Sequence, residues 1–222
     1  MKVVLLEHTP HPDSVVAAAA RLCYSSSDIE IIRKRLEGPK ADELVKKLIA
    51  MGHESPLEHV SFTFGIEDVS RALSHQLVRH RIASYSQQSQ RYVKFADFDY
   101  VVPPSILADD HARAKFTEAM EYLSQVYGEL LQSVPAEDAR YVLPNACTTK
   151  LIATMNARSL YNLFNLRCCR RAQWEIQQLA WEMLRQVKEV APAVFSAAGP
   201  DCWGAQGCGE GDMSCGDPPE RT

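Results

Sequence analysis

The sequence predicts an α+β fold in which a mostly antiparallel sheet is flanked by helices within a single domain. Three observations favour this class. Short segments with strand patterns occur near the start, in the middle and late in the chain, and segments with helical periodicity separate them. The 222 residues, 46% of them hydrophobic, are enough for one substantial core. The order of the strands in the sheet does not follow from these patterns.

The first part of the chain predicts a strand followed by two helices. Residues 2–6 have the pattern of a short buried strand, and Asp13 is suited to cap an alanine-rich helix that runs to about Cys23. The pattern over residues 25–39 fits neither class well. A second helix is predicted over about residues 41–51, because its apolar residues share one face and Gly52 follows it.

The middle of the chain predicts a strand, a helix and a polar loop. Apolar residues alternate over residues 60–66, which is the period of a half-buried strand. Asp68 is then expected to cap a helix whose C-terminal end carries Arg79-His80-Arg81. Residues 84–91 are polar and are expected to form a loop.

The second half of the chain predicts mainly helices. A long amphipathic helix is expected over residues 109–134, a strand over 148–155, and further helices over 157–167 and 172–190. The tail from about Gly199 is rich in Gly, Asp, Pro and Cys and is expected to be irregular. We assign residues 1–222 to one domain that includes this tail.

Composition excludes several classes of protein. The formal net charge of −4 argues against general nucleic-acid binding, which depends on a positive field. No apolar run approaches the ~20 residues of a membrane span, so no membrane association is expected. Seven cysteines, an odd number, favour a reduced and therefore cytoplasmic environment. Cys202, Cys208 and Cys215 lack the close pairs of zinc ribbons and are expected to be free thiols, with no metal.

One stretch of this acidic chain carries only positive charge. Residues 69–96 contain no Asp or Glu, and the planar guanidinium group of arginine suits phosphate because it can donate two parallel hydrogen bonds. The simpler interpretation is that a basic helix end complements the helix dipole and a solvated loop follows. The basic residues are Arg71, His75, Arg79, His80, Arg81, Arg91 and Lys94.

The spacing within this stretch distinguishes the two interpretations. Residues 79–91 read RHRIASYSQQSQR, which resembles the signature RHRxxSxxxxSxR of flavin-dependent thymidylate synthases at every fixed position. Residues 53–59 (HESPLEH), 140–144 (RYVLP) and 156–167 are similar to further segments of that family. Gln87 is one departure, because a Glu is also common there in the family.

The resemblance implies a reaction, its cofactors and an assembly. It implies reductive methylation of dUMP to dTMP, with methylenetetrahydrofolate as the carbon donor and FAD, reduced by NADPH, as the hydride donor. It also implies a homotetramer whose active sites are shared between subunits. The chain has no glycine-rich nucleotide-binding loop, so side chains would have to hold the flavin.

The resemblance also implies the residues of the site. The catalytic residues implied are Arg167, Ser89 and His53. His53 would lie beside the flavin ring, where its imidazole can stack on the folate. The cofactor-binding residues implied are Ser55, Arg79, His80, Arg81, Gln87, Asn156, Ala157, Arg158 and Asn162. The substrate-binding residues implied are Gln76, Leu77, Val78, Arg79, Gln87, Gln88, Ser89, Gln90, Arg91, Arg140 and Arg167.

Residue chemistry refines two of these roles and bears on two nearby cysteines. A cation at Arg167 can stabilise negative charge that develops on the uracil ring. Ser89 is expected to position dUMP by hydrogen bonding and not by covalent attack, because His80, the nearest base in sequence, should be weakened by surrounding arginines. An arginine beside Cys168 and Cys169 could lower a thiol pKa, although two half-buried structural cysteines are the simpler interpretation.

Two other functions remain open at this stage. A regulatory module could use the 79–91 loop to bind RNA phosphates while Tyr85 and Tyr92 stack on bases, although the acidic net charge weakens this alternative. A simple NADPH oxidase flavoprotein would consume NADPH without any response to dUMP.

Overall fold

The computed structural model of the chain describes residues 1–36, 38–95, 97–204 and 206–221. The chain divides into two compact units. The first unit consists of Met1–Lys2, Ile66–Arg79 and Tyr85–Ile152. The second consists of Val3–Gly65, His80–Ser84 and the residues from Ala153 onward. The assignment of the whole chain to one domain stays a prediction.

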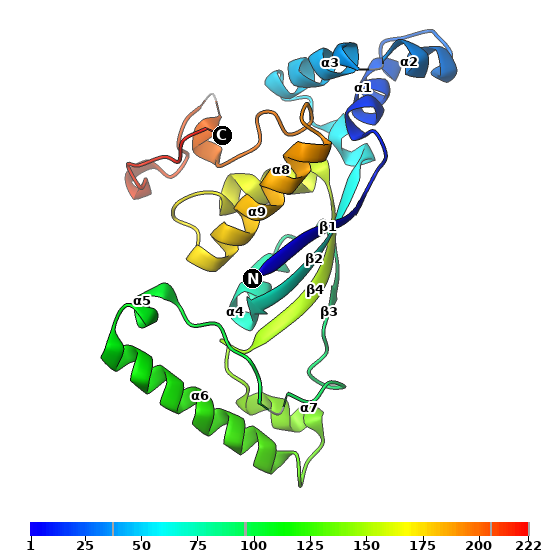
Figure 1. Ribbon diagram of the computed structural model, residues 1–222. Helices are drawn as coiled ribbons and strands as arrows, with labels where there is room; N and C mark the ends of the chain where they lie inside the picture. Colours follow the sequence, from blue (N-terminus) through cyan, green and yellow to red (C-terminus); the bar gives the residue numbers. More distant parts are fainter. Residues whose placement is uncertain (37, 96, 205, 222) are drawn as a thin grey trace. The chain divides into compact units, whose positions relative to one another are not determined.

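The strands form an antiparallel sheet with the order β1-β2-β4-β3 (Figure 1). The predicted α+β class and antiparallel sheet are therefore confirmed. Along β4 the side chains alternate as expected for a half-buried strand: Leu151 and Ala153 are buried, whereas Ile152 between them is 47% exposed. The strands are β1 (Lys2–His8), β2 (Ser61–Ser70), β3 (Ser84–Gln87) and β4 (Thr148–Asn156).

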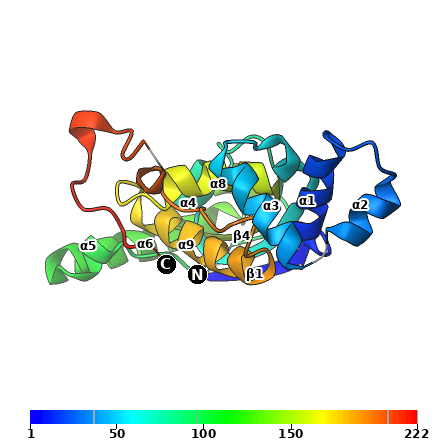
Figure 2. The same ribbon diagram turned by 90° about the horizontal axis from the view of Figure 1, so that it is seen from above.

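The second unit contains most of the helices. The helix α1 packs against α2, α3 and η1, and α8 lies beside α9 in both views (Figures 1 and 2). The Phe195 ring lies at the centre of its core, 5.2 Å from the ring of Phe62 and 6.0 Å from that of Phe164. Its helices are α1 (Pro12–Leu22), α2 (Ile29–Arg35), α3 (Pro39–Ala50), η1 (Ser55–His59), α8 (Ala157–Arg167), α9 (Trp174–Val190), η3 (Asp201–Trp203) and η4 (Gly211–Met213).

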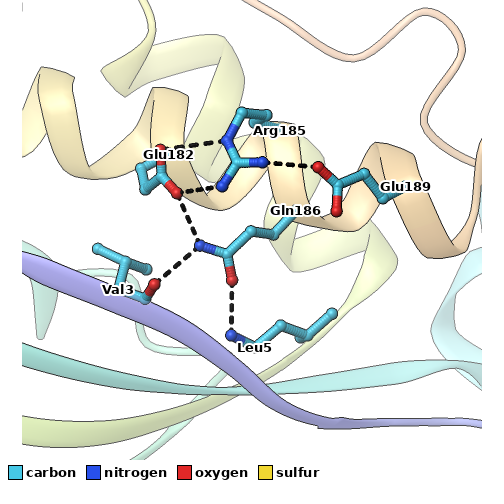
Figure 3. A network of polar contacts seen from close by, with 6 residues as sticks. All are labelled: Val3, Leu5, Glu182, Arg185, Gln186 and Glu189. Atoms are coloured by element: carbon cyan, nitrogen blue, oxygen red, sulfur yellow. Dashed lines mark hydrogen bonds and ion pairs between the residues drawn. The ribbon is translucent and has the colours of Figure 1, made fainter.

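A glutamine of α9 covers the backbone of the edge strand β1 (Figure 3). The Gln186 side chain accepts a hydrogen bond from the Leu5 N–H at 2.6 Å and donates one to the Val3 carbonyl at 2.9 Å. Its amide nitrogen also donates to Glu182 at 2.9 Å. Because an open strand edge can pair with another chain, this side chain satisfies groups that would otherwise be a template for association.

The first unit contains the long helix α6. Asp109, which the sequence predicted as the first residue of this helix, instead caps it by accepting a hydrogen bond from the Ala112 N–H at 3.0 Å. Phe98, Met120 and Cys147 form its buried cluster. Its helices are α4 (Arg71–Leu77), α5 (Pro104–Leu107), α6 (Asp110–Leu130), α7 (Ala136–Ala139) and η2 (Arg140–Val142).

Three local predictions were wrong. Asp68 does not cap a helix: β2 continues through it, and Ser70 caps α4 by accepting from the Leu73 N–H at 3.0 Å. The start of α4 is fixed there because its first two N–H groups donate to the carbonyls of Cys147 and Asn145, a tertiary contact.

Asp13 does not cap α1 either: that helix begins at Pro12 after His11, and the Asp13 side chain accepts from the Val194 N–H at 2.7 Å. The third wrong prediction is the loop over residues 84–91, and residues 25–39, which fitted neither class, also contain an element. The polar residues 84–91 include the strand β3, and residues 25–39 include the short helix α2. Both elements are too short for their periodicity to be distinctive. None of the helices in the described part of the chain has the length and apolar character that a membrane span requires.

Candidate active site

The residues predicted for the site fall into two sets, one in each unit. The first unit carries the residues predicted for the nucleotide except Arg167, and two of them, Arg79 and Gln87, were also predicted for the flavin. The second unit carries the remaining residues predicted for the flavin and folate, together with Arg167. The second set is His53, Ser55, His80, Arg81, Asn156, Ala157, Arg158, Asn162 and Arg167.

In the first unit, one glutamate contacts two arginines from separate motifs. Glu137 Oε2 accepts from Arg91 Nε at 2.9 Å and lies 2.8 Å from Arg91 Nη2. The backbone carbonyl of Glu137 accepts from Arg140 Nε at 3.1 Å. Arg91 ends the 79–91 segment, whereas Arg140 begins the 140–144 segment. The fold therefore brings together two cations that the sequence separates by about fifty residues.

Arg71, at the start of α4, belongs to the same group of cations. Burial lowers the pKa of its guanidinium group, the neighbouring Cys147 opposes this shift, and the positive charge of Arg140 lowers the pKa further. An arginine remains charged despite such a shift, so a partly buried cation adds to the local positive field. Arg71 lies in the acid-free stretch, but no motif position distinguished it, and the site prediction omitted it.

The polar loop that follows β3 is held by hydrogen bonds within the first unit. Gln87 Nε2 donates to Ser74 Oγ at 3.0 Å and to Thr149 Oγ1 at 3.1 Å, so this amide is already engaged. Ser89 Oγ accepts from the Arg91 N–H at 3.1 Å. The Gln88 N–H donates to the Lys150 carbonyl at 2.9 Å. The loop is thus preorganised before any ligand binds.

Gln90 in the same loop has an amide nitrogen without a partner. Its Nε2 atom is buried and makes no hydrogen bond within the described residues. A buried donor left unsatisfied costs about 1–3 kcal/mol, so its persistence needs an explanation. A bound molecule with an acceptor at this point would remove that cost. Its neighbours in the chain, Ser89 and Arg91, are also donors, and this combination fits an anionic molecule with carbonyl oxygens.

Other predicted residues of the first unit are placed differently. The side chain of Leu77 is fully buried, and its carbonyl accepts from the Tyr85 hydroxyl at 2.9 Å. Burial raises the pKa of Tyr85 to about 12, so this hydroxyl stays protonated. Val78 and Arg79 follow α4 and are exposed, and Gln76 lies on the last turn of that helix.

In the second unit, Arg167 and His80 form the central pair. Arg167 Nε donates to His80 Nε2 at 3.2 Å. His80 is only 8% exposed, and its pKa is lowered to about 4, first by burial and then by the charge of Arg167. The imidazole is therefore neutral at pH 7 and accepts this hydrogen bond. The expectation that neighbouring arginine makes His80 a weak base is confirmed.

Two residues predicted for the flavin lie at the start of α8 and make hydrogen bonds within the protein, Asn156 through its side chain and Ala157 through its backbone. Asn156 caps the helix by accepting from the Ser159 N–H at 2.8 Å. The Ala157 N–H donates to the Val60 carbonyl at 3.0 Å, and its side chain is buried. Asn162 lies on the second turn and is exposed.

Arg158 connects α8 to the segment 53–59. It lies 3.3 Å from Glu54 Oε2 and 2.5 Å from Glu58 Oε1. Two motifs of the sequence thus meet through ion pairs that the motif patterns did not reveal. His53 and Ser55 lie in the same segment and are exposed, as is Arg81 elsewhere in this unit. Their side chains are therefore accessible to a ligand.

The two cysteines after Arg167 differ in character. Cys168 is fully buried, and burial raises its pKa to about 12, so it is an unreactive thiol at pH 7. The interpretation of Cys168 as a structural residue is confirmed, and the alternative of a lowered pKa is wrong for it. Cys169 is partly exposed.

Known proteins resemble this chain over nearly its whole length. The family model described as "Thymidylate synthase complementing protein" matches residues 4–193. A Geobacter sulfurreducens protein named flavin-dependent thymidylate synthase is 57% identical over 219 residues, covering 97% of this chain and 94% of its own length. A Clostridium tetani protein with the same name is 53% identical over 233 residues, covering 97% of this chain and 93% of its own length.

Proposed function

This chain belongs to the family of flavin-dependent thymidylate synthases and is an enzyme, and from that premise we propose that it methylates dUMP to dTMP using FAD, NADPH and methylenetetrahydrofolate. The observation that carries the nucleotide part of this proposal is the gathering of Arg71, Arg91 and Arg140 in the first unit. Guanidinium groups bind phosphate bidentately, and this group lies beside the loop with the unsatisfied Gln90 donor.

For dUMP, the proposal divides phosphate and base between these residues. Arg91 and Arg140 hold the phosphate, and Arg71 adds positive charge. When dUMP binds, its phosphate replaces the Glu137 carboxylate on Arg91, so that the guanidinium group has an anionic partner both before and after binding. Gln90 donates to a uracil carbonyl, and Ser89, whose Oγ already accepts from the backbone, donates its hydroxyl hydrogen to the nucleotide. Gln76, Gln87 and Gln88 complete the polar surface.

For the flavin, the donors available are exposed side chains. Arg79 and Arg81 match the pyrophosphate of FAD, and Ser55, Arg158 and Asn162 are accessible polar partners on the segments that the Arg158 ion pairs connect. His53 offers a flat ring that can stack on folate. Bound and reduced, FAD supplies the hydride, whereas methylenetetrahydrofolate supplies only the methylene carbon, so that tetrahydrofolate is released.

Arg167 performs the electrostatic task in this proposal. Methylation at C5 requires electron density to build up in the uracil ring, and a fixed cation stabilises the charge that appears on the ring edge. His80 stays neutral and accepts from Arg167 Nε, which leaves the terminal nitrogens of the guanidinium group to donate to the substrate. His80 therefore acts as a positioning residue and not as a general base. Assembly as a homotetramer with shared active sites, in the cytoplasm, is part of the same proposal.

The test is an assay for dTMP with each component left out in turn. We expect a yellow protein that releases FAD on denaturation, and dTMP only when the FAD-containing protein receives dUMP, methylenetetrahydrofolate and NADPH together. Oxidation of NADPH that does not respond to dUMP would favour a simple flavoprotein oxidase. A colourless protein that shifts RNA in a gel would favour the nucleic-acid-binding alternative.

A further inference from the structure

Four cysteines from separate segments of the second unit line one cavity of about 420 Å³. Cys169 follows the end of α8, whereas Cys202, Cys208 and Cys215 lie in the C-terminal tail. All are free thiols. The three tail cysteines alone provide one sulfur too few for a tetrahedral metal site. The fold adds the fourth sulfur, that of Cys169.

Ion pairs hold the tail around this cavity. Arg171 Nη1 donates to Glu210 Oε2 at 2.8 Å and to the Met213 carbonyl at 2.5 Å. Arg170 lies 2.5 Å from Asp217 Oδ2. These two arginines follow directly on the first of the four cysteines, so the contacts that hold the tail also bring its thiols toward that residue.

Trp203, next to the first tail cysteine, anchors the tail to α9. Its ring packs edge-on against Trp181 with centroids 5.6 Å apart, and Lys188 Nζ lies 5.7 Å from the ring centroid. Its indole N–H donates to the Pro219 carbonyl at 2.8 Å. A Cβ on Gly199 would lie 2.1 Å from the Trp203 ring, so only glycine fits beneath it. The irregular tail is therefore built into the unit.

The four thiols line one cavity, and such a set of sulfur donors suits a divalent cation such as zinc. Four thiolates could not coexist there unpaired, whereas a divalent metal ion deprotonates the thiols that coordinate it. The Arg171 N–H donates to Cys169 Sγ at 3.5 Å, the kind of contact that orients a metal ligand.

We propose that Cys169, Cys202, Cys208 and Cys215 bind one zinc ion. Four sulfur donors in tetrahedral arrangement are typical of zinc, and a complete set of protein ligands characterises a structural site. Within the described residues, no three His, Cys, Asp or Glu side chains are already placed as ligands, so the side chains must close around the ion.

The tail has the backbone freedom for this closure. Gly207 precedes Cys208 with a φ of +71°, and Gly216 follows Cys215 with a φ of +70°, a region that favours glycine. The zinc ion then ties the tail to the end of α8, two residues beyond Arg167. This inference does not depend on the proposed reaction, because zinc content and activity are measured separately.

The first test measures zinc in the full chain. The protein is produced with zinc in the medium, purified without oxygen, freed of loosely bound metal and analysed for metal content. We expect one zinc ion per chain, its loss in Cys208→Ser and Cys215→Ser, and its retention in the matched control Cys23→Ser, an exposed cysteine outside the cavity. Zinc retained in both variants, iron in place of zinc, or no stoichiometric metal would overturn the proposal.

The second test avoids variants that fail to fold. The wild-type chain is treated with iodoacetamide, with and without prior removal of zinc by a chelator, and the labelled cysteines are identified by mass spectrometry. We expect Cys169, Cys202, Cys208 and Cys215 to be protected only with zinc, and Cys23 to be labelled in both samples. Labelling that does not depend on zinc, or disulfides among the four residues in protein never exposed to air, would overturn the site.

Discussion

Arg167 Nε donates a hydrogen bond to His80 Nε2 at 3.2 Å, although 87 residues separate them along the chain. This contact fixes the direction of the guanidinium group and forces the imidazole to remain neutral, because a protonated ring has no acceptor at that nitrogen. His80, which belongs to the 79–91 signature, thereby positions Arg167 at the end of α8. Arg167 is the residue to which we assign charge stabilisation.

The neutral state of His80 predicts how stability depends on pH. Its folded pKa of about 4 lies below the ordinary value of 6.5, so the unfolded chain binds the proton more readily. The free energy of unfolding should therefore lose roughly 1.4 kcal/mol per pH unit between about pH 6 and pH 4 from this group, and nothing from it above pH 7. Urea unfolding at several pH values measures this, with His80→Gln expected to flatten the slope. An unchanged slope in His80→Gln, or an equal change in the exposed control His111→Gln, would contradict the assignment.

Replacing Arg167 should reduce turnover strongly. Arg167→Ala removes both the cation proposed to stabilise the uracil and the donor to His80, so kcat should fall by about two orders of magnitude or more. Arg167→Lys should not restore it fully, because a point charge cannot reproduce the planar fork. In Arg167→Ala the pKa of His80, followed by NMR, should also rise. The control is Arg185→Ala on the surface of α9, and near-normal turnover in Arg167→Ala would remove this residue from the mechanism.

The pair of arginines connected by Glu137 should discriminate the nucleotide from its nucleoside. Arg91→Ala or Arg140→Ala removes charge-assisted hydrogen bonds worth about 1.5–3 kcal/mol, which weakens dUMP binding by roughly one to two orders of magnitude. Deoxyuridine, which lacks the phosphate, should lose little. Calorimetry with both ligands gives the comparison, and Arg113→Ala on α6 is the matched control. Equal losses for dUMP and deoxyuridine would show that these residues do not hold the phosphate.

Flavin retention should depend on the exposed arginines of the signature. The double variant Arg79→Ala/Arg81→Ala is expected to fold, since neither side chain is in the core, but to purify with little FAD. The ratio of flavin absorbance to protein absorbance measures this, and unfolding in urea checks the fold. Full FAD occupancy in the double variant would show that the flavin is held elsewhere.

Activation of dUMP should not require a covalent bond to the protein. Cys168 is buried with a pKa of about 12, and Ser89 has no neighbouring base assigned to it, so neither is an effective nucleophile. Ser89→Ala should be impaired but measurably active, and Cys168→Ala should keep turnover while losing some stability. Mass spectrometry of the intact enzyme during turnover should show no uracil adduct. A stable adduct on any cysteine or on Ser89 would overturn the non-covalent mechanism.

The sequence by itself determined the elements whose signals are local. The alternation in β2 and the helical patterns of α3, α6, α8 and α9 depend on residues within a few positions of one another, and the structure has these elements where they were predicted. The 79–91 signature likewise identified the family from one continuous segment, because the spacing of its residues is itself the signal.

Only the tertiary structure decided which side chains meet. The cap of α4 moved from Asp68 to Ser70 because carbonyls near residue 146 fix the start of that helix, and both residue types can cap. The contact of Arg91 with Glu137 and the convergence of Cys169 with the tail cysteines are equally invisible in the sequence. Such pairings depend on the path of the chain between distant residues, whereas periodicity and capping report only the conformation of their immediate neighbours.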